Sequence, residues 1–179
     1  MLPRLGAGHI QRGFEFYAWL ALCQACGVER YVELGWGSGA TAQAAKDAGF
    51  RVASVDIAPE PPGGQREGIL YIASESWAPA AVARAIEHLG GPPDAVFVDA
   101  DHLNGSPRRD FEAWWPHTRT LMGFHDVEWM DSGALWREVS PKHRSLEILA
   151  RDDLARAEWA AWGMREAGIG ILFKHTARP

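Results

Sequence analysis

Three glycines at alternate positions, Gly35, Gly37 and Gly39, have the spacing that most directly indicates chemistry. They follow the strand-like apolar residues 31–34 and lead into residues 40–46, a run of good helix formers. Glycine lets the backbone approach a ligand closely, and the free N–H groups of a helix N-terminus favour negative charge. The pattern predicts a seat for an electron-rich group; the alternative is a tight turn that holds no ligand.

An acid follows the glycine loop at a distance that is typical of nucleoside sites. Asp56 ends the apolar segment 50–55 and lies about twenty residues after the loop. A carboxylate at that place can accept hydrogen bonds from both hydroxyls of a ribose. The glycine loop and Asp56 together predict a nucleoside-bearing ligand.

Polar side chains recur wherever a strand is predicted to end. They are found in residues 33–39, at Asp56, in residues 74–76, in residues 99–102, and at His125 and Asp126. One acid at a strand end could be a helix cap. Five polar strand ends along one edge indicate a site, because ligands of open α/β sheets bind at the carboxyl ends of the strands.

The elements that position these residues alternate along the chain. Apolar runs and turn residues predict strands at 31–34, 50–57, 69–73, 94–99, 121–126, 146–149 and 169–173. Helices are predicted at 14–26, 38–48, 79–89, 106–116, 133–139 and 152–162. This alternation predicts an α/β chain with a mostly parallel sheet and right-handed crossovers. The length of 179 residues favours a single domain.

Residues 32–39 (Val-Glu-Leu-Gly-Trp-Gly-Ser-Gly) resemble the first motif of class I S-adenosylmethionine-dependent methyltransferases. The third glycine comes one residue earlier than in the dinucleotide fingerprint, and Glu33 lies two residues before the first glycine. Residues 97–102, 109–116 and 124–127 resemble a bacterial branch whose strands end in Asp-x-Asp-His and His-Asp. That branch is close to the metal-dependent O-methyltransferases.

The resemblance implies a Rossmann-like fold and one cofactor. The sheet would have seven strands in the order 3-2-1-4-5-7-6, with strand 7 antiparallel and helices on both faces. The single domain would span residues 1–179, with 1–27 as a helical extension and 28–175 as the core. S-adenosyl-L-methionine would be held through residues that the motif matches, namely Glu33, Gly35, Gly37, Ser38 and Gly39 for its methionine part, Asp56 for the ribose, Ser76 for the adenine, and Asp99.

The resemblance also implies a divalent metal. Asp99, His125 and Asp126 match its ligands, and His102 falls where relatives carry a lysine base. A hydroxyl is a weak nucleophile, and a bound Mg²⁺ lowers its pKa while a histidine can take its proton. Nitrogen is a less natural Mg²⁺ ligand than oxygen. His125 could therefore contact a metal ligand without binding the metal itself, or the site could prefer Mn²⁺ or another transition metal. Alternatively, the two carboxylates orient cofactor amines or cap the following segments.

The resulting expectation is metal-assisted O-methylation of a hydroxyl on a small-molecule acceptor. Two alternatives stay open: a non-catalytic cofactor-binding module, and a different reaction on the same fold, as in cephalosporin hydroxylase-like proteins. Cofactor binding without methyl transfer to a broad panel of acceptors would favour the binding module.

Composition restricts the partners. The formal net charge of −5 and the lack of a long basic run argue against nucleic acid. No apolar run approaches the roughly 20 residues of a membrane span, and the N-terminus lacks a signal-peptide core, so we expect a cytoplasmic protein. Cys23 and Cys26 have no second ligand pair and are predicted to be buried structural thiols. A homodimer is left open.

Overall fold

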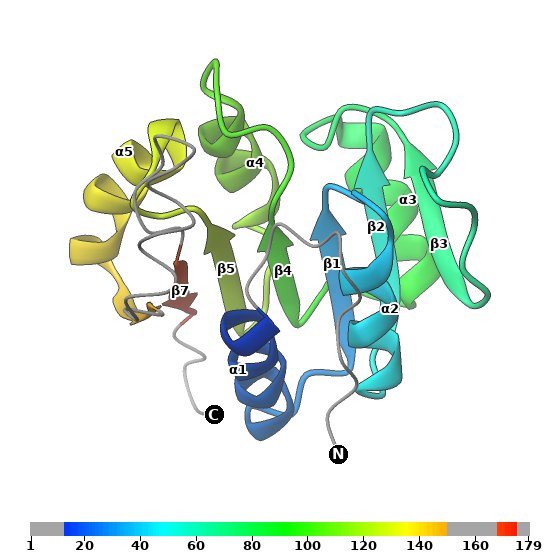
Figure 1. Cartoon of the computed structure of the whole chain (residues 1–179), viewed down its shortest axis with the longest axis horizontal. Coiled ribbons are helices and arrows are strands. Elements are labelled where there is room, and N and C mark those ends of the chain that lie inside the picture. The colour runs from blue at the N-terminus through cyan, green and yellow to red at the C-terminus, as the bar shows by residue number, and fades with distance from the viewer. Residues whose placement is uncertain (1–12, 150–167, 175–179) are drawn as a thin grey trace.

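The computed structural model describes residues 13–149 and 168–174, and Figure 1 shows a twisted sheet with helices on both faces. The seven strands lie in the order β3-β2-β1-β4-β5-β7-β6. Their bounds are β1 Arg30–Leu34, β2 Arg51–Asp56, β3 Ile69–Ala73, β4 Ala95–Val98, β5 Leu121–His125, β6 Arg144–Ile148 and β7 Ile169–Phe173. The predicted strand order is confirmed.

Strand direction also agrees with the prediction. The pairs β1–β2, β1–β4, β2–β3 and β4–β5 are parallel, whereas β7 runs antiparallel to both β5 and β6. Parallel neighbours need a crossover connection. A helix supplies it between β1 and β2 and between β4 and β5, whereas residues 57–68 connect β2 to β3 without a helix. The carboxyl ends of β1 to β5 therefore meet at one edge of the sheet, where the predicted site residues lie.

The helices are α1 Gly13–Ala25, α2 Ala40–Asp47, α3 Pro79–Leu89, α4 Ser106–Trp114 and α5 Met130–Val139, with a short 3-10 helix at Ser140–Lys142. The predicted start of α5 at Gly133 is three residues late. Glycine is a poor helix former, and its presence within the first turn of a helix needs a tertiary reason. In the fold, a Cβ at Gly133 would lie 2.9 Å from the Val127 carbonyl oxygen, so glycine lets the first turn of α5 pack on that backbone. The predicted helix 152–162 lies outside the described residues.

Aromatic side chains fill the core on both faces of the sheet. On the face covered by α1 and α2, Trp19 stacks on Phe97 with ring centroids 5.6 Å apart, and its indole N–H donates to the Tyr31 hydroxyl at 3.2 Å. On the other face, Trp114 and Trp136 pack beneath α3, α4 and α5. Burial of each such side chain stabilises the fold by roughly 1.5–3 kcal/mol. The packed core therefore holds the strands, and the residues at their ends, in fixed positions.

The two cysteines differ in burial. Cys23 lies in the core, as predicted, whereas Cys26 is exposed, so the prediction of two buried thiols is wrong for Cys26. Helix α1 ends at Ala25, and Cys26 lies in the turn that leads to Gly27, where the backbone has a positive φ.

Within the described residues, no helix has the length and apolar character needed to cross a membrane.

Candidate active site

The glycine loop connects β1 to α2 and lies directly against the end of β4. Gly35 has a φ of +96°, and a Cβ there would lie only 2.2 Å from the Asp99 carbonyl oxygen. The loop can approach Asp99 this closely only because residue 35 is glycine. Gly37 has a φ of +53° and no atom that would contact a Cβ, and Gly39 precedes α2 in the left-handed conformation. The three glycines thus leave the N-terminus of α2 open to a ligand.

Glu33 is completely buried in β1, beneath the glycine loop. Within the described part of the chain, neither of its carboxylate oxygens makes a hydrogen bond. Burial raises its pKa well above the ordinary value; the Thr41 hydroxyl lowers this pKa and the charge of Asp99 raises it further. A buried carboxylate that pairs with no cation among the described residues is costly, so a cationic group next to Glu33 would be stabilised strongly. The ammonium group of an amino acid fits this requirement.

Asp56 ends β2 with its carboxylate already oriented. One oxygen accepts the backbone N–H of Trp36 at 2.7 Å, and the other accepts that of Ala58 at 2.9 Å. Each carboxylate oxygen retains a lone pair for a further donor, such as a ribose hydroxyl. The indole N–H of Trp36 donates to the Pro62 carbonyl at 2.8 Å, which ties the loop 59–64 to the glycine loop.

Ser76 lies after β3 and is buried against α4. Its hydroxyl donates to Asp110 at 2.5 Å, and its carbonyl accepts the indole N–H of Trp114 at 2.8 Å. The hydroxyl proton is therefore already used within the protein. The role of Ser76 at an adenine stays a prediction.

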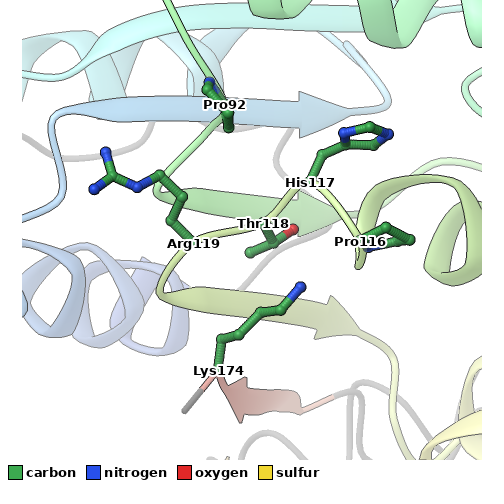
Figure 2. A pocket seen from close by; sticks show the side chains of 6 residues that line it. All are labelled: Pro92, Pro116, His117, Thr118, Arg119 and Lys174. Carbon is green, nitrogen blue, oxygen red and sulfur yellow. The ribbon is translucent and has the colours of Figure 1, made fainter. Parts of the chain in front are cut away.

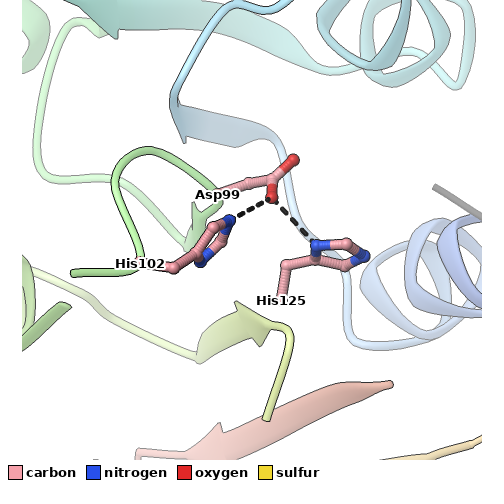
Figure 3. A group of neighbouring side chains, drawn as sticks. All are labelled: Asp99, His102 and His125. Carbon is pink, nitrogen blue, oxygen red and sulfur yellow. Dashed lines mark ion pairs between the residues drawn. The ribbon is translucent and has the colours of Figure 1, made fainter. Parts of the chain in front are cut away.

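Asp99, His102 and His125 converge at the ends of β4 and β5, as Figure 3 shows. Oδ1 of Asp99 lies 3.0 Å from Nδ1 of His125 and 3.6 Å from Nε2 of His102. One ligand atom from each of the three residues falls within 4.8 Å of the others, which is close enough for a single cation to contact all three. The group contains His102, which we expected as a base, and omits Asp126, which we expected as a ligand.

Asp126 nevertheless lies next to this group. Its carboxylate oxygens are 3.3 Å from Nε2 of His102 and 3.3 Å from Nδ1 of His125. Its backbone is left-handed, with a φ of +58°. This conformation costs a non-glycine residue about 1–3 kcal/mol and is found often at functional sites. Burial raises its pKa, but the two histidines outweigh this effect, so the pKa is lowered overall.

His125 is the most deeply buried member of the group, with 3% of its surface exposed. Burial alone would lower its pKa, but Asp99 and Asp126 together raise it well above the ordinary value. Its contact with Asp99 is short but lacks hydrogen-bond geometry, and within the described residues neither ring nitrogen makes a hydrogen bond. A metal cation bound through a ring nitrogen would satisfy this buried imidazole, so the donor set fits a divalent metal.

The N-terminal turn of α5 holds the loop that carries His102. Nδ1 of His102 lies 3.1 Å from the Ser132 hydroxyl, and the carbonyl of His102 accepts the backbone N–H of Asp131 at 3.2 Å. The Asp131 carboxylate in turn accepts the N–H of Gly105 at 2.8 Å. These contacts direct Nε2 of His102 toward Asp99 and Asp126. Trp129 lies beside the same imidazole, with ring centroids 6.2 Å apart, and is half-buried.

Sequence reasoning missed Asp110, Asp131 and Ser132. Each acts across about thirty residues of chain, as the separations of Ser76 from Asp110 (34) and of His102 from Ser132 (30) show. Asp110 alone carried a signal, because it lies in the segment 109–116 that resembles the methyltransferase branch.

A hollow of about 450 Å³ lies at the opposite edge of the sheet (Figure 2). It is lined by Pro92, Pro116, His117, Thr118, Arg119 and Lys174. Arg119 pairs with Asp94 at 3.4 Å, and the Lys174 ammonium donates to the Trp115 carbonyl. These cations already have partners within the protein, and the hollow is separate from the Asp99 group.

A family model described as a methyltransferase domain matches residues 32–127, which include the glycine loop, Asp56, Asp99 and Asp126. The chain belongs to this methyltransferase family. The expected methyltransferase family is thereby confirmed. No curated protein matches the chain.

Solved structures share the fold of this methyltransferase. An O-methyltransferase from Bacillus cereus in complex with SAH is 14% identical, with a TM-score of 0.66 and coverage of 97% of this chain and 84% of the other. Cofactor-bound Rv0187 from MTB is 15% identical, with a TM-score of 0.67 and coverage of 96% and 83%. MycE from the mycinamycin biosynthetic pathway, in complex with Mg and SAH, is 15% identical, with a TM-score of 0.60 and coverage of 98% and 53%. This methyltransferase spans only a third to a half of the MycE chain, and at these identities the likeness concerns the fold alone.

Proposed function

We propose that the protein is an S-adenosylmethionine-dependent O-methyltransferase that uses a divalent metal to methylate a hydroxyl of a small molecule. The observation that carries the proposal is the convergence of Asp99, His102 and His125 beside the glycine loop. The close approach of Gly35 to Asp99 makes a cofactor seat and a metal-capable group direct neighbours. A methyl donor and an activated acceptor need this proximity.

The cofactor contacts follow from the groups that need partners. Glu33 would bind the ammonium of the methionine part, and the N-terminus of α2 would bind its carboxylate. The backbone of Gly37 and Ser38 lies at the open part of the loop, and Asp56 would accept the ribose hydroxyls. Ser76 would border the adenine.

Asp99, Asp126 and His125 would hold the metal, which when bound supplies a Lewis acid that lowers the pKa of the acceptor hydroxyl. Imidazole nitrogen next to carboxylate oxygen suits Mn²⁺ or another transition metal better than Mg²⁺. The Ser132 hydroxyl can accept a hydrogen bond from the N–H at Nδ1 of His102, and in that tautomer the lone pair of Nε2 is directed into the site. His102 is then the base.

The chain's residues position and deprotonate the acceptor. Nε2 of His102 would take the hydroxyl proton of the acceptor. The methyl donor, when bound, would supply the methyl group to the acceptor oxygen and leave as a neutral thioether that keeps the electrons of the broken carbon–sulfur bond. Because no covalent enzyme intermediate forms, in-line positioning dominates the rate.

Calorimetry with S-adenosylmethionine and S-adenosylhomocysteine tests the cofactor assignment, and the absence of binding to intact protein refutes it. The metal is tested separately by measuring methyl transfer to a panel of phenols and alcohols before and after treatment with EDTA. Activity should disappear with EDTA, return with Mn²⁺, and be lost in Asp99→Asn. Unchanged turnover in EDTA refutes the metal assignment, and cofactor binding without transfer to any acceptor favours a binding module.

We also propose that this single-domain protein acts in the cytoplasm on a diffusible acceptor rather than on nucleic acid or a membrane. Its net charge of −5 supports this choice. A homodimer would cover the side of the site where the methyl acceptor binds. Light scattering during size-exclusion chromatography tests this assembly, and a monomer mass would refute it.

A further inference from the structure

Helix α4 fixes both polar groups of Ser76. Asp110 and Trp114 are four residues apart on α4 and therefore lie on the same side of the helix. Asp110 accepts the Ser76 hydroxyl at 2.5 Å, and the Trp114 indole donates to the Ser76 carbonyl at 2.8 Å. Ser76, Asp110 and Trp114 are all buried, so water does not compete for these bonds.

The bond to Asp110 decides what the Ser76 oxygen can offer a ligand. A hydroxyl has one proton to donate and two lone pairs to accept with. A separation of 2.5 Å is typical of a hydroxyl that donates to an ionised carboxylate, for which about 2.5–2.7 Å is expected. With its proton committed to Asp110, the Ser76 oxygen can act toward a ligand only as an acceptor.

The protonation of Asp110 supports this direction of donation. Burial raises the pKa of Asp110 to about 7; the Ser76 hydroxyl and Arg109 lower it, and Asp101 and Glu75 raise it. At pH 8 the carboxylate is therefore mostly ionised and has no proton to give to Ser76.

Ser76 lies close to the predicted ribose site. Asp56 and Ala73 are paired across β2 and β3, and the N–H of Ser74 donates to the Asp56 carbonyl at 2.9 Å. Ser76 follows two residues later, between this strand end and α4. A base attached to a ribose at Asp56 would reach this segment.

We propose that Asp110 is a positioning residue that sets the base specificity of the cofactor site. By holding the Ser76 proton, Asp110 makes the Ser76 oxygen an acceptor for the amino group of a 6-aminopurine. A 6-oxopurine would place a second acceptor against it, and two lone pairs cannot form a hydrogen bond. This inference rests on the proposed function and on the placement of Ser76 at the base.

The test is calorimetry at pH 8 with S-adenosylhomocysteine and S-inosylhomocysteine, which differ in the amino or oxo group at position 6 and in the proton that the oxo form carries on N1. The unmodified protein should bind the adenine compound roughly 10- to 100-fold more tightly. In Asp110→Ala the freed hydroxyl can rotate and donate to the oxo group, so the ratio should fall toward one. Ser76→Ala should lower the ratio in the same way and removes only one oxygen, so it serves if Asp110→Ala fails to fold.

Glu112→Ala is the matched control, because it removes an exposed carboxylate from the same helix. Its ratio should equal that of the unmodified protein. A merely structural role for Asp110 would weaken both ligands equally and leave the ratio unchanged, and that result overturns the inference. Equal affinity of the unmodified protein for both compounds overturns it as well, whereas no binding of S-adenosylhomocysteine overturns the proposed function on which it rests.

Discussion

Replacing Asp110 by asparagine should change how the stability of the protein depends on pH. Burial raises the pKa of Asp110 from 3.8 to about 7, so the folded state holds this proton more tightly than the unfolded chain does. Ionisation therefore destabilises the fold by an amount that is absent below about pH 4, grows as the pH rises, and is complete above about pH 7. Multiplying the rise in pKa by about 1.4 kcal/mol per pKa unit gives a cost of about 4 kcal/mol.

Asparagine has nearly the shape of a protonated aspartate and stays neutral at every pH. The free energy of unfolding of Asp110→Asn, relative to that of the unmodified protein, should therefore increase by up to about 4 kcal/mol between pH 4 and pH 8, which means that the variant becomes relatively more stable. Urea titration at several pH values, followed by tryptophan fluorescence, measures this difference because the chain has nine tryptophans.

Glu33 and His125 also titrate, but they do so in both proteins and cancel in the comparison. Glu112→Gln, which changes an exposed carboxylate of the same helix, should follow the unmodified protein at every pH. A constant difference in unfolding free energy between Asp110→Asn and the unmodified protein, from pH 4 to pH 8, would refute the reasoning.

Three further substitutions test the site. Gly35→Ala should destabilise the fold by roughly 2 kcal/mol or more and abolish cofactor binding, because the added Cβ would clash with the Asp99 carbonyl oxygen. A thermal unfolding midpoint equal to that of the unmodified protein would contradict this prediction. Glu33→Gln should stabilise the protein above pH 7, since it removes a buried ionisable group, yet weaken S-adenosylmethionine binding about tenfold or more; tighter binding by calorimetry would show that Glu33 does not face the ammonium. His102→Gln should lower kcat by roughly 10²–10⁴-fold with little change in cofactor affinity, and steady-state kinetics with full activity would exclude it as the base.

The positions of the strands could be predicted because their signals are local, whereas their order in the sheet was implied by the resemblance to class I methyltransferases. Buried strands such as Ala95–Val98 read as short apolar runs, and glycines at positions such as 49 and 90 end helices through a positive φ. Where a local signal and a tertiary contact disagree, prediction failed. Gly133 suggests a boundary, yet it lies inside α5 because the helix packs on Val127 there.

The candidate site was predictable as a set of strand ends but not as a geometry. Parallel strands had to bring Asp99 and His125 to the same edge, and they do so at 3.0 Å. The sequence could not show that Ser132 turns His102 toward the carboxylates, because that contact depends on how α5 crosses the loop after β4. The same is true of Asp110, whose partner lies on another loop.

The carboxyl edge of the sheet is built at the expense of the protein's own stability. Glu33 is a buried carboxyl without a hydrogen-bond partner among the described residues, and Asp126 keeps a left-handed backbone at a cost of about 1–3 kcal/mol. His125 lies buried between two carboxylates that raise its pKa against the effect of burial. None of these features improves packing. An ammonium group would neutralise Glu33, and a metal cation would take the place of the proton that His125 shares with the two carboxylates. Ligands that bind only the folded state would stabilise it, by an amount that grows with the logarithm of their concentration over Kd. If the proposed cofactor and metal bind here, their binding would offset the stability that the protein loses at this edge.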